Sequence, residues 1–348
     1  DTPSSRGLGD VYKRQGVDML RRCRALLSAQ LPGGLKLWIT LLTLGFVGWA
    51  LAGHAAGLRS LAITARGWWW LTLALGLSWL SLIVNAAAWQ VLVGWLGHDR
   101  GPVPLMPLYL SSNLLKYLPG GVWHFLQRVR ILGPLIGTGP ALVSVLLEPM
   151  LMAVAALLWV PFGGWQSGLA LLVPLPALLL LPRWREPLLC RLERSRLRQL
   201  NRSDPDLASL PPLEQLGSGR DDYPWTPLMA ELVFIAARFS GFWCCVEVFD
   251  LASVLPVGSW MAAFALAWAI GLVVPAAPGG LGVFEAVLLL RLGGSVPEAA
   301  LLAVALSYRL VVTLADLLAA AGVKMDRIIA LRLDQLSDSP QSSSGSSS

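Results

Sequence analysis

The sequence predicts an all-α polytopic membrane protein, with about six full spanning helices and two broken re-entrant hairpins in an inverted repeat. Composition is the first reason: 55% of the 348 residues are hydrophobic and 14% are charged, against roughly 25% charged in an average soluble domain. The apolar residues also form long runs, and about 20 apolar residues are enough to cross a bilayer. The third reason is a pair of Pro-Gly-Gly tripeptides that interrupt the membrane region in corresponding places. An ordinary cytosolic globular domain is therefore excluded.

Two N-terminal segments are set apart from the membrane region. Residues 1–15 resemble a translated cloning or sequencing adaptor, since the chain starts at Asp1, and we leave them out of the fold prediction. Residues 16–35 are basic, which predicts a cytoplasmic N-terminal segment.

The first membrane half is predicted over residues 36–182. Its apolar runs cover residues 36–52, 68–96, 141–161 and 167–181. A signal peptide is the alternative for residues 36–52, because a basic segment precedes this run and small residues follow it. We favour a retained helix, because the run is longer than a typical signal-peptide core of about 7–15 residues and closer to spanning length.

A polar, Arg-rich and Pro-containing segment, residues 183–226, separates the two halves. It predicts a cytoplasmic loop or an amphipathic surface segment. The second membrane half is predicted over residues 227–323, with apolar runs at residues 228–251, 260–274, 280–292 and 297–321. Residues 324–348 end in a Ser-rich sequence of low complexity, which predicts a disordered cytoplasmic tail.

The distribution of Lys and Arg predicts the orientation. Apart from residues 1–15, 16 basic residues collect on one side of the predicted spans, whereas the other side has two, Arg59 and Arg66. Because cytoplasmic loops carry the excess of positive charge, both termini and the central linker are expected in the cytoplasm. The basic residues do not interleave with exposed aromatic residues on one face, so no nucleic-acid partner is expected.

The two Pro-Gly-Gly tripeptides begin at Pro119 and Pro278, 159 residues apart. Each lies in a predicted hairpin, residues 103–132 and residues 258–292, that follows one long apolar run and precedes another. With the orientation above, the first hairpin enters from the cytoplasm and the second from outside, so the halves are inverted. Interrupted segments at corresponding places of inverted halves indicate a transport site near the membrane midplane.

The two Pro-Gly-Gly breaks favour the binding of an anionic ligand. Broken backbone inside a bilayer must be buried in protein or line an aqueous cavity, and the helices that begin near Gly121 and Gly280 would direct their partly positive N-termini at that cavity. The alternative is that each Pro-Gly-Gly only kinks a packed helix.

Ionisable residues within the apolar runs are the next candidates, because a charge at mid-bilayer needs a partner, a cavity or the interface. His124 and Arg128 are four residues apart and share one helix face, and Lys116 precedes the first break. Arg238 and Arg309 lie deeper in long runs and are the best candidates for contacting a phosphate. Structural ion pairing between helices is the alternative for each of them. The available counter-charges are Glu148, Glu231, Glu247, Asp250, Glu285 and Asp316.

No catalytic, metal or cofactor site is expected. The three histidines and four cysteines are scattered along the chain, and the sequence contains no zinc-protease, nucleophile-elbow or phosphate-loop motif.

Two segments resemble a known family. Residues 113–124 (NLLKYLPGGVWH) and 275–286 (PAAPGGLGVFEA) are similar to the signature segments of the lysylphosphatidylglycerol synthase transmembrane region, the flippase-like domain. The second segment has Phe284 where the family commonly has Arg before the Glu. The resemblance covers about residues 35–331 of this chain.

The resemblance implies a multi-pass protein of the bacterial inner membrane, whose relatives move aminoacylated phosphatidylglycerol between leaflets. In those relatives a soluble aminoacyl-transferase domain follows. Here the chain ends soon after Arg332, so that domain is expected to be absent. We therefore expect no catalytic residues and a membrane phospholipid as partner.

The leading hypothesis is a flippase-like protein that binds or moves an anionic or aminoacylated phospholipid headgroup. The alternatives are a non-transporting anchor for a separate lipid-modifying enzyme, and a transferase that uses Glu148 or Glu285 as general base. The sequence predicts no oligomeric state. The candidate headgroup-binding residues are Asn113, Lys116, Pro119, Gly120, Gly121, His124, Arg128, Glu148, Arg238, Pro278, Gly279, Gly280, Glu285 and Arg309.

Overall fold

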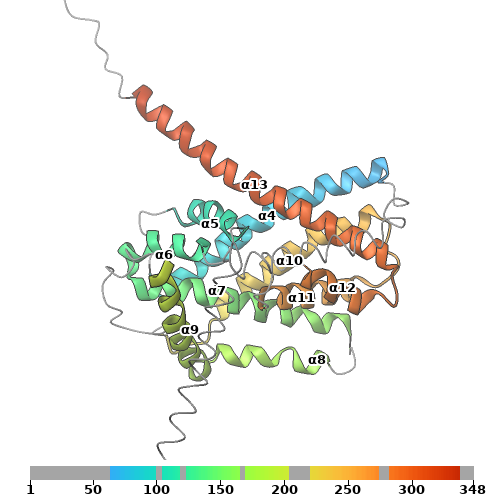
Figure 1. The fold of residues 1–348 in the computed structure, drawn as a ribbon, viewed down its shortest axis with the longest axis horizontal. Coiled ribbons are helices and arrows are strands. Elements are labelled where there is room, and N and C mark those ends of the chain that lie inside the picture. The colour runs from blue at the N-terminus through green and yellow to red at the C-terminus, as the bar shows by residue number, and fades with distance from the viewer. Residues whose placement is uncertain are drawn as a thin grey trace, which may run out of the picture.

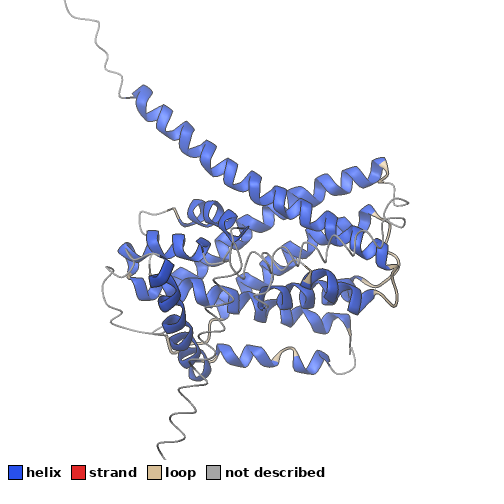
Figure 2. Cartoon of the chain, in the orientation of Figure 1, coloured by secondary structure: helices blue, strands red, loops and turns tan. Residues whose placement is uncertain are grey.

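A computed structural model describes residues 63–98, 104–117, 123–164, 169–203, 220–273 and 282–337. Within these ranges every regular element is a helix (Figure 2). The all-α prediction is therefore confirmed for the described part of the chain. The predicted helix at residues 36–52 and both Pro-Gly-Gly tripeptides lie outside it.

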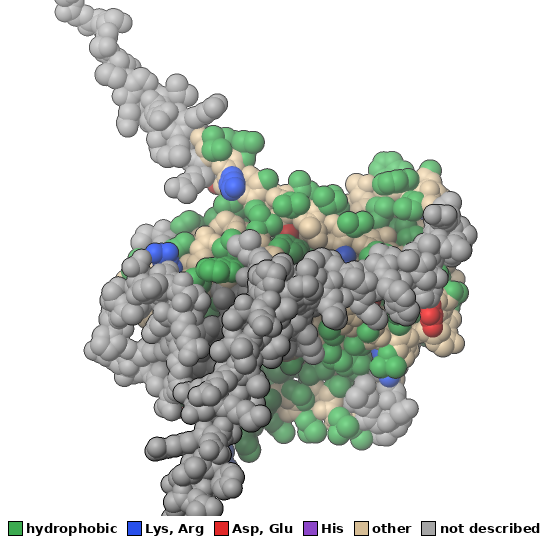
Figure 3. Space-filling model, in the orientation of Figure 1, with side chains coloured by type: hydrophobic (Ala, Val, Ile, Leu, Met, Phe, Trp, Pro, Cys, Tyr) green, Lys and Arg blue, Asp and Glu red, His purple; other side chains and the backbone are tan. Residues whose placement is uncertain are grey.

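Four of the described helices are long and apolar enough to cross a membrane. They are α4 (Ala65–Trp95), α7 (Thr138–Trp159, continued by the 3-10 turn η2 at Val160–Gly163), α10 (Trp225–Val248) and α13 (Glu298–Ser337). Each contains all or most of one of the long apolar runs predicted from the sequence. Large apolar side chains also face outward, such as Leu290 and Leu310. Figure 3 shows hydrophobic side chains over much of the described surface on one face, with few charges among them. The chain is thus a multi-pass membrane protein.

Shorter helices flank each Pro-Gly-Gly segment. Before the first lie α5 (Leu105–Asn113) and the 3-10 turn η1 (Leu114–Tyr117), and after it comes α6 (Trp123–Ile136). The second lies between α11 (Val257–Val273) and α12 (Val283–Leu292). Both predicted hairpins therefore contain a helix on each side of the break.

Three segments refine or correct the sequence prediction. The apolar run at residues 167–181 forms two short pieces, α8 (Leu169–Leu172) and η4 (Leu175–Leu180), because Pro174 and Pro176 lack the N–H that a continuous helix needs. Part of the predicted linker is a helix, α9 (Pro182–Ser203), which fits the amphipathic alternative.

The third segment, the end of α13, is a correction. Residues 324–337 were expected in a disordered tail, whereas α13 continues as a helix to Ser337. This stretch has no Pro or Gly, and Leu, Arg, Lys, Met, Ala and Gln make up most of it; these residues extend a helix at little cost. Figure 1 shows the end of α13 extending beyond the other helices.

The buried Arg185 secures the start of α9. Its guanidinium donates to the backbone oxygens of Leu180, Arg220 and Asp222 and pairs with Glu186. This basic residue thus connects α9 to the segment that leads into α10.

Helices α4 and α10 form a closely packed antiparallel pair. Their contacts join Gly67 to Val248 and Ser78 to Gly241, so the numbers rise along one helix as they fall along the other. A Cβ built on Gly241 would lie 2.5 Å from Ser78 Oγ, closer than real side chains approach. Small residues allow membrane helices to approach in this way. Helix α13 crosses α4 near the middle of the molecule (Figure 1), which brings three spans together at the candidate site.

Candidate functional site

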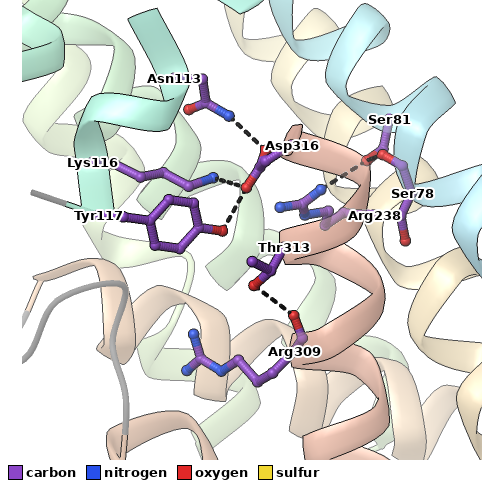
Figure 4. Close-up of polar contacts among 9 residues, drawn as sticks. All are labelled: Ser78, Ser81, Asn113, Lys116, Tyr117, Arg238, Arg309, Thr313 and Asp316. Atoms are coloured by element: carbon purple, nitrogen blue, oxygen red, sulfur yellow. Dashed lines mark hydrogen bonds and ion pairs between the residues drawn. The ribbon is translucent and has the colours of Figure 1, made fainter. Parts of the chain in front are cut away.

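Asp316 on α13 is the centre of the first polar cluster (Figure 4). Its side chain is fully buried and pairs with Lys116 Nζ at 2.6 Å. It also accepts hydrogen bonds from Asn113 Nδ2 at 2.8 Å and from the Tyr117 hydroxyl at 2.6 Å. The donors lie on α5 and η1, just before the first Pro-Gly-Gly, so this cluster ties the first predicted hairpin to α13.

Arg238 on α10 lies beside that cluster. Its Nη1 donates to Ser81 Oγ at 3.0 Å. The guanidinium points between Ser81 and Asp316 (Figure 4), and Asp316 is within its electrostatic reach. Only 6% of the residue is exposed, yet Arg238 Nε has no hydrogen-bond partner among the described residues.

Two more buried hydroxyls near Arg238 have unused hydrogen-bonding capacity. Ser78 Oγ, one turn from Ser81 on α4, lacks a partner within the described part of the chain. The same holds for the hydroxyl of Tyr308 on α13, which is within electrostatic reach of Arg238. The described structure therefore places one buried cation, Arg238 with its unused Nε, in the same region as two unused hydroxyls, Ser78 Oγ and Tyr308 OH.

Arg128 and Glu148 form a second, self-contained cluster between α6 and α7. Arg128 Nη1 is 2.7 Å from Glu148 Oε2, and both side chains are almost fully buried. Tyr109 OH donates to Glu148 Oε1 at 2.5 Å, and Arg128 Nε donates to Ser112 Oγ at 3.0 Å. The guanidinium also lies over the rings of Tyr109 and Trp89, at 3.8 and 5.3 Å from their centroids. This geometry matches the alternative of structural ion pairing.

Glu285 and Arg309 form a third cluster, next to the second Pro-Gly-Gly. Arg309 Nε is 3.1 Å from Glu285 Oε1, and the other oxygen of Glu285 accepts from the backbone N–H of Gly282 at 2.8 Å. Glu285 thus caps its own helix, α12, and also ties it to α13. Arg309 lies over the ring of Phe284 at 5.3 Å, so the Phe in this motif contributes a cation–π contact.

Seven of the fourteen predicted candidates therefore divide among three clusters. Asn113 and Lys116 join Asp316, which was predicted only as a counter-charge, and Arg238 lies beside them. His124 packs against Phe125, with ring centroids 3.8 Å apart. Six candidates lie outside the described residues: Pro119, Gly120, Gly121, Pro278, Gly279 and Gly280.

Sequence reasoning missed the uncharged members of the clusters. Tyr117 follows Lys116 at the first break, and that position was the one available signal for it. Ser78, Ser81 and Tyr308 lie in apolar runs, and Tyr109 lies in the first predicted hairpin; no sequence pattern distinguishes them. Among the described residues, no three His, Cys, Asp or Glu side chains come together as a metal site.

Residues 35–320 match the family model described as the lysylphosphatidylglycerol synthase TM region. The matched range includes all three polar clusters and agrees with the resemblance of the two motif segments. No curated protein matches the chain.

Proposed function

The chain belongs to the family of the lysylphosphatidylglycerol synthase TM region, and we propose that it binds an anionic or aminoacylated phospholipid headgroup of the phosphatidylglycerol type within the membrane and moves it between leaflets. Membership of the family supports a membrane domain that handles lipid. The polar clusters on α13 suggest where a headgroup binds.

One observation supports this most directly: Arg238 is a buried cation whose Nε is unused among the described residues. A charged side chain in the middle of a membrane costs about 3 kcal/mol on insertion scales. Arg128 and Arg309 offset this cost through carboxylates at 2.7 and 3.1 Å. Arg238 instead bonds the neutral Ser81. A phosphate is the complementary ligand, because the planar guanidinium matches its oxygens.

The neighbouring groups complete this proposed site. Ser78 and Tyr308 have hydroxyls that can donate to the other phosphate oxygens. Lys116 can turn from Asp316 to the phosphate, and an ammonium group of an aminoacylated headgroup would then pair with the vacated carboxylate. The Asp316 cluster thus exchanges one internal ion pair for contacts with both ends of such a headgroup.

The two predicted hairpins provide the moving parts of the proposed cycle. Residues before the first break bond Asp316, and Glu285 after the second break bonds Arg309. The hairpins enter from opposite sides of the inner membrane, and both termini lie in the cytoplasm. Opening one hairpin at a time would give the headgroup access from one leaflet at a time.

Headgroup accessibility tests this proposal. The purified protein is placed in liposomes with headgroup-labelled fluorescent phosphatidylglycerol, and dithionite then quenches the label in the outer leaflet. We expect the wild type to expose inner-leaflet lipid faster than empty liposomes do, and Arg238→Gln to return this rate to background. Arg291→Gln is the matched control, because Arg291 lies at an exposed end of α12; it should keep the wild-type rate.

Each negative result of the dithionite assay contradicts a different part of the proposal. Equal rates for the wild type and Arg238→Gln would place the headgroup elsewhere. A wild type that does not exceed empty liposomes would exclude translocation. In that case, a soluble enzyme that co-purifies in stoichiometric amount would support the anchor alternative, and a new lipid in extracts of expressing cells would support the transferase alternative.

A further inference from the structure

Glu231 is a buried carboxylate that none of the three clusters uses. It lies in the membrane-spanning helix α10 and is 1% exposed. Neither of its oxygens has a hydrogen-bond partner within the described ranges. In contrast, Glu148, Glu285 and Asp316 each bond a cation and at least one further donor.

The charges around Glu231 do not favour its ionised form. Glu148 on α7 is within electrostatic reach and has the same sign. Arg128 and Tyr109 face this region from α6 and α5, but their side chains are bonded to Glu148. Arg128, the described cation that faces this pair of carboxylates, is thus already engaged.

In the described part of the chain, the other elements packed near Glu231 supply no free counter-charge. Helix α11 contains no titratable residue, and α4 presents the neutral Ser78, Ser81 and Asn85 on its buried face. On α13, Tyr308 is neutral, Arg309 bonds Glu285, and Asp316 is an acid. On α10 itself, Arg238 is seven residues from Glu231, which is about 10 Å along a helix.

We propose that Glu231 is a proton-binding site within the membrane, and that it holds a proton in the conformation described here. Binding is simple protonation of the carboxylate, with no other bond made or broken. An unpaired carboxylate in a low-dielectric interior strongly favours its neutral form. The neutral acid also removes repulsion with Glu148, so the Arg128–Glu148 pair stays intact.

Release of this proton has a mechanical consequence. An ionised Glu231 would compete with Glu148 for Arg128, which joins α6, after the first break, to α7. Proton exchange therefore controls whether the first hairpin is held or released. This coupling rests on the proposed lipid translocation, whereas proton binding itself does not.

Infrared spectroscopy tests proton binding without any transport. The full chain in liposomes is titrated from acidic to alkaline pH, and the C=O stretch of protonated carboxylic acids is recorded. We expect an acid band that persists at neutral pH and is lost in both Glu231→Gln and Glu231→Leu. Glu298→Gln, at an exposed residue, should keep it. An acid band that survives both Glu231 substitutions, or a wild type without one at neutral pH, would overturn the proposal.

The coupling is tested by the dithionite assay at several pH values. Glu231→Gln resembles the protonated acid, so its headgroup exposure rate should lose most of the pH dependence of the wild type. Equal pH profiles would disprove the coupling, even with the infrared result positive. A wild type that moves no lipid at any pH would disprove translocation and the coupling together, while the infrared band would still decide proton binding.

Discussion

Arg309 and Asp316 lie two turns apart on α13, and each bonds a segment next to a different Pro-Gly-Gly. Arg309 pairs with Glu285 after the second break, and Asp316 pairs with Lys116 before the first. One rigid helix therefore connects the two interrupted regions. A displacement of α13 would therefore act on both.

Asp316→Asn should destabilise the protein. Lys116, 24% exposed, and the Tyr117 hydroxyl would lose a charged partner, and breaking a buried ion pair costs about 3 kcal/mol or more. We expect a lower Tm in detergent by circular dichroism. In a double-mutant cycle, adding Lys116→Gln to Asp316→Asn should cost less than Lys116→Gln costs alone. Additive effects would mean that the two side chains are not coupled.

Gly241→Val should disturb the packing of α4 against α10. A Cβ at Gly241 would lie 2.5 Å from Ser78 Oγ and 3.4 Å from the Ala74 backbone oxygen. We expect destabilisation of about 1–3 kcal/mol, as for other overpacked sites, and a large loss of headgroup movement, because Arg238 is three residues away. Gly76→Val is the control: a Cβ there meets nothing within 4 Å. Similar effects of both substitutions would indicate loss of helix flexibility and not a steric clash.

The spans were predictable because they depend on local composition. A long apolar run such as residues 228–251 predicts a membrane helix without any knowledge of where the other helices pack. Helix α10 contains most of this run. Most basic residues lie at or beyond the ends of such runs. Arg238 and Arg309 lie deeper within them, so they could be recognised from the sequence as exceptions.

The bonding partners of the site residues could not be predicted from local composition. Asp316 and Lys116 are 200 positions apart, and only the packing of α13 against α5 and η1 brings them together. The spacing of seven residues between Arg309 and Asp316 corresponds to about two helical turns, but it does not show that each side chain bonds a different segment. Tyr117 and Ser81 have no charge to mark them in the sequence. The prediction for the end of α13 was wrong because the disorder expected of the Ser-rich end was also assigned to the residues before it, which favour a helix.

Glu285→Ala should separate two roles of one side chain. It removes both the cap on the Gly282 N–H and the partner of Arg309. Loss of a helix cap alone costs about 1 kcal/mol. Glu285→Gln keeps a capping oxygen but loses the charge, so we expect an intermediate Tm. Hydrogen exchange should show faster amide exchange at the start of α12 in Glu285→Ala than in Glu285→Gln. Equal exchange would mean that the cap does not order this end.

Labelling of single cysteines should establish the orientation predicted from the basic residues. In a variant without the four native cysteines, Arg66→Cys lies in the first turn of α4, on the side with few positive charges, and Asp326→Cys lies in the C-terminal part of α13, on the basic side. Since cytoplasmic ends carry the excess of Lys and Arg, a membrane-impermeant maleimide should label Arg66→Cys in intact spheroplasts and Asp326→Cys only after lysis. Both residues are exposed, so access depends on the membrane and not on burial.

The reverse labelling pattern would invert the orientation of the whole domain and the side from which each hairpin opens. Labelling of both sites from outside would show that the two ends of this region lie on the same side, which would contradict the predicted number of crossings.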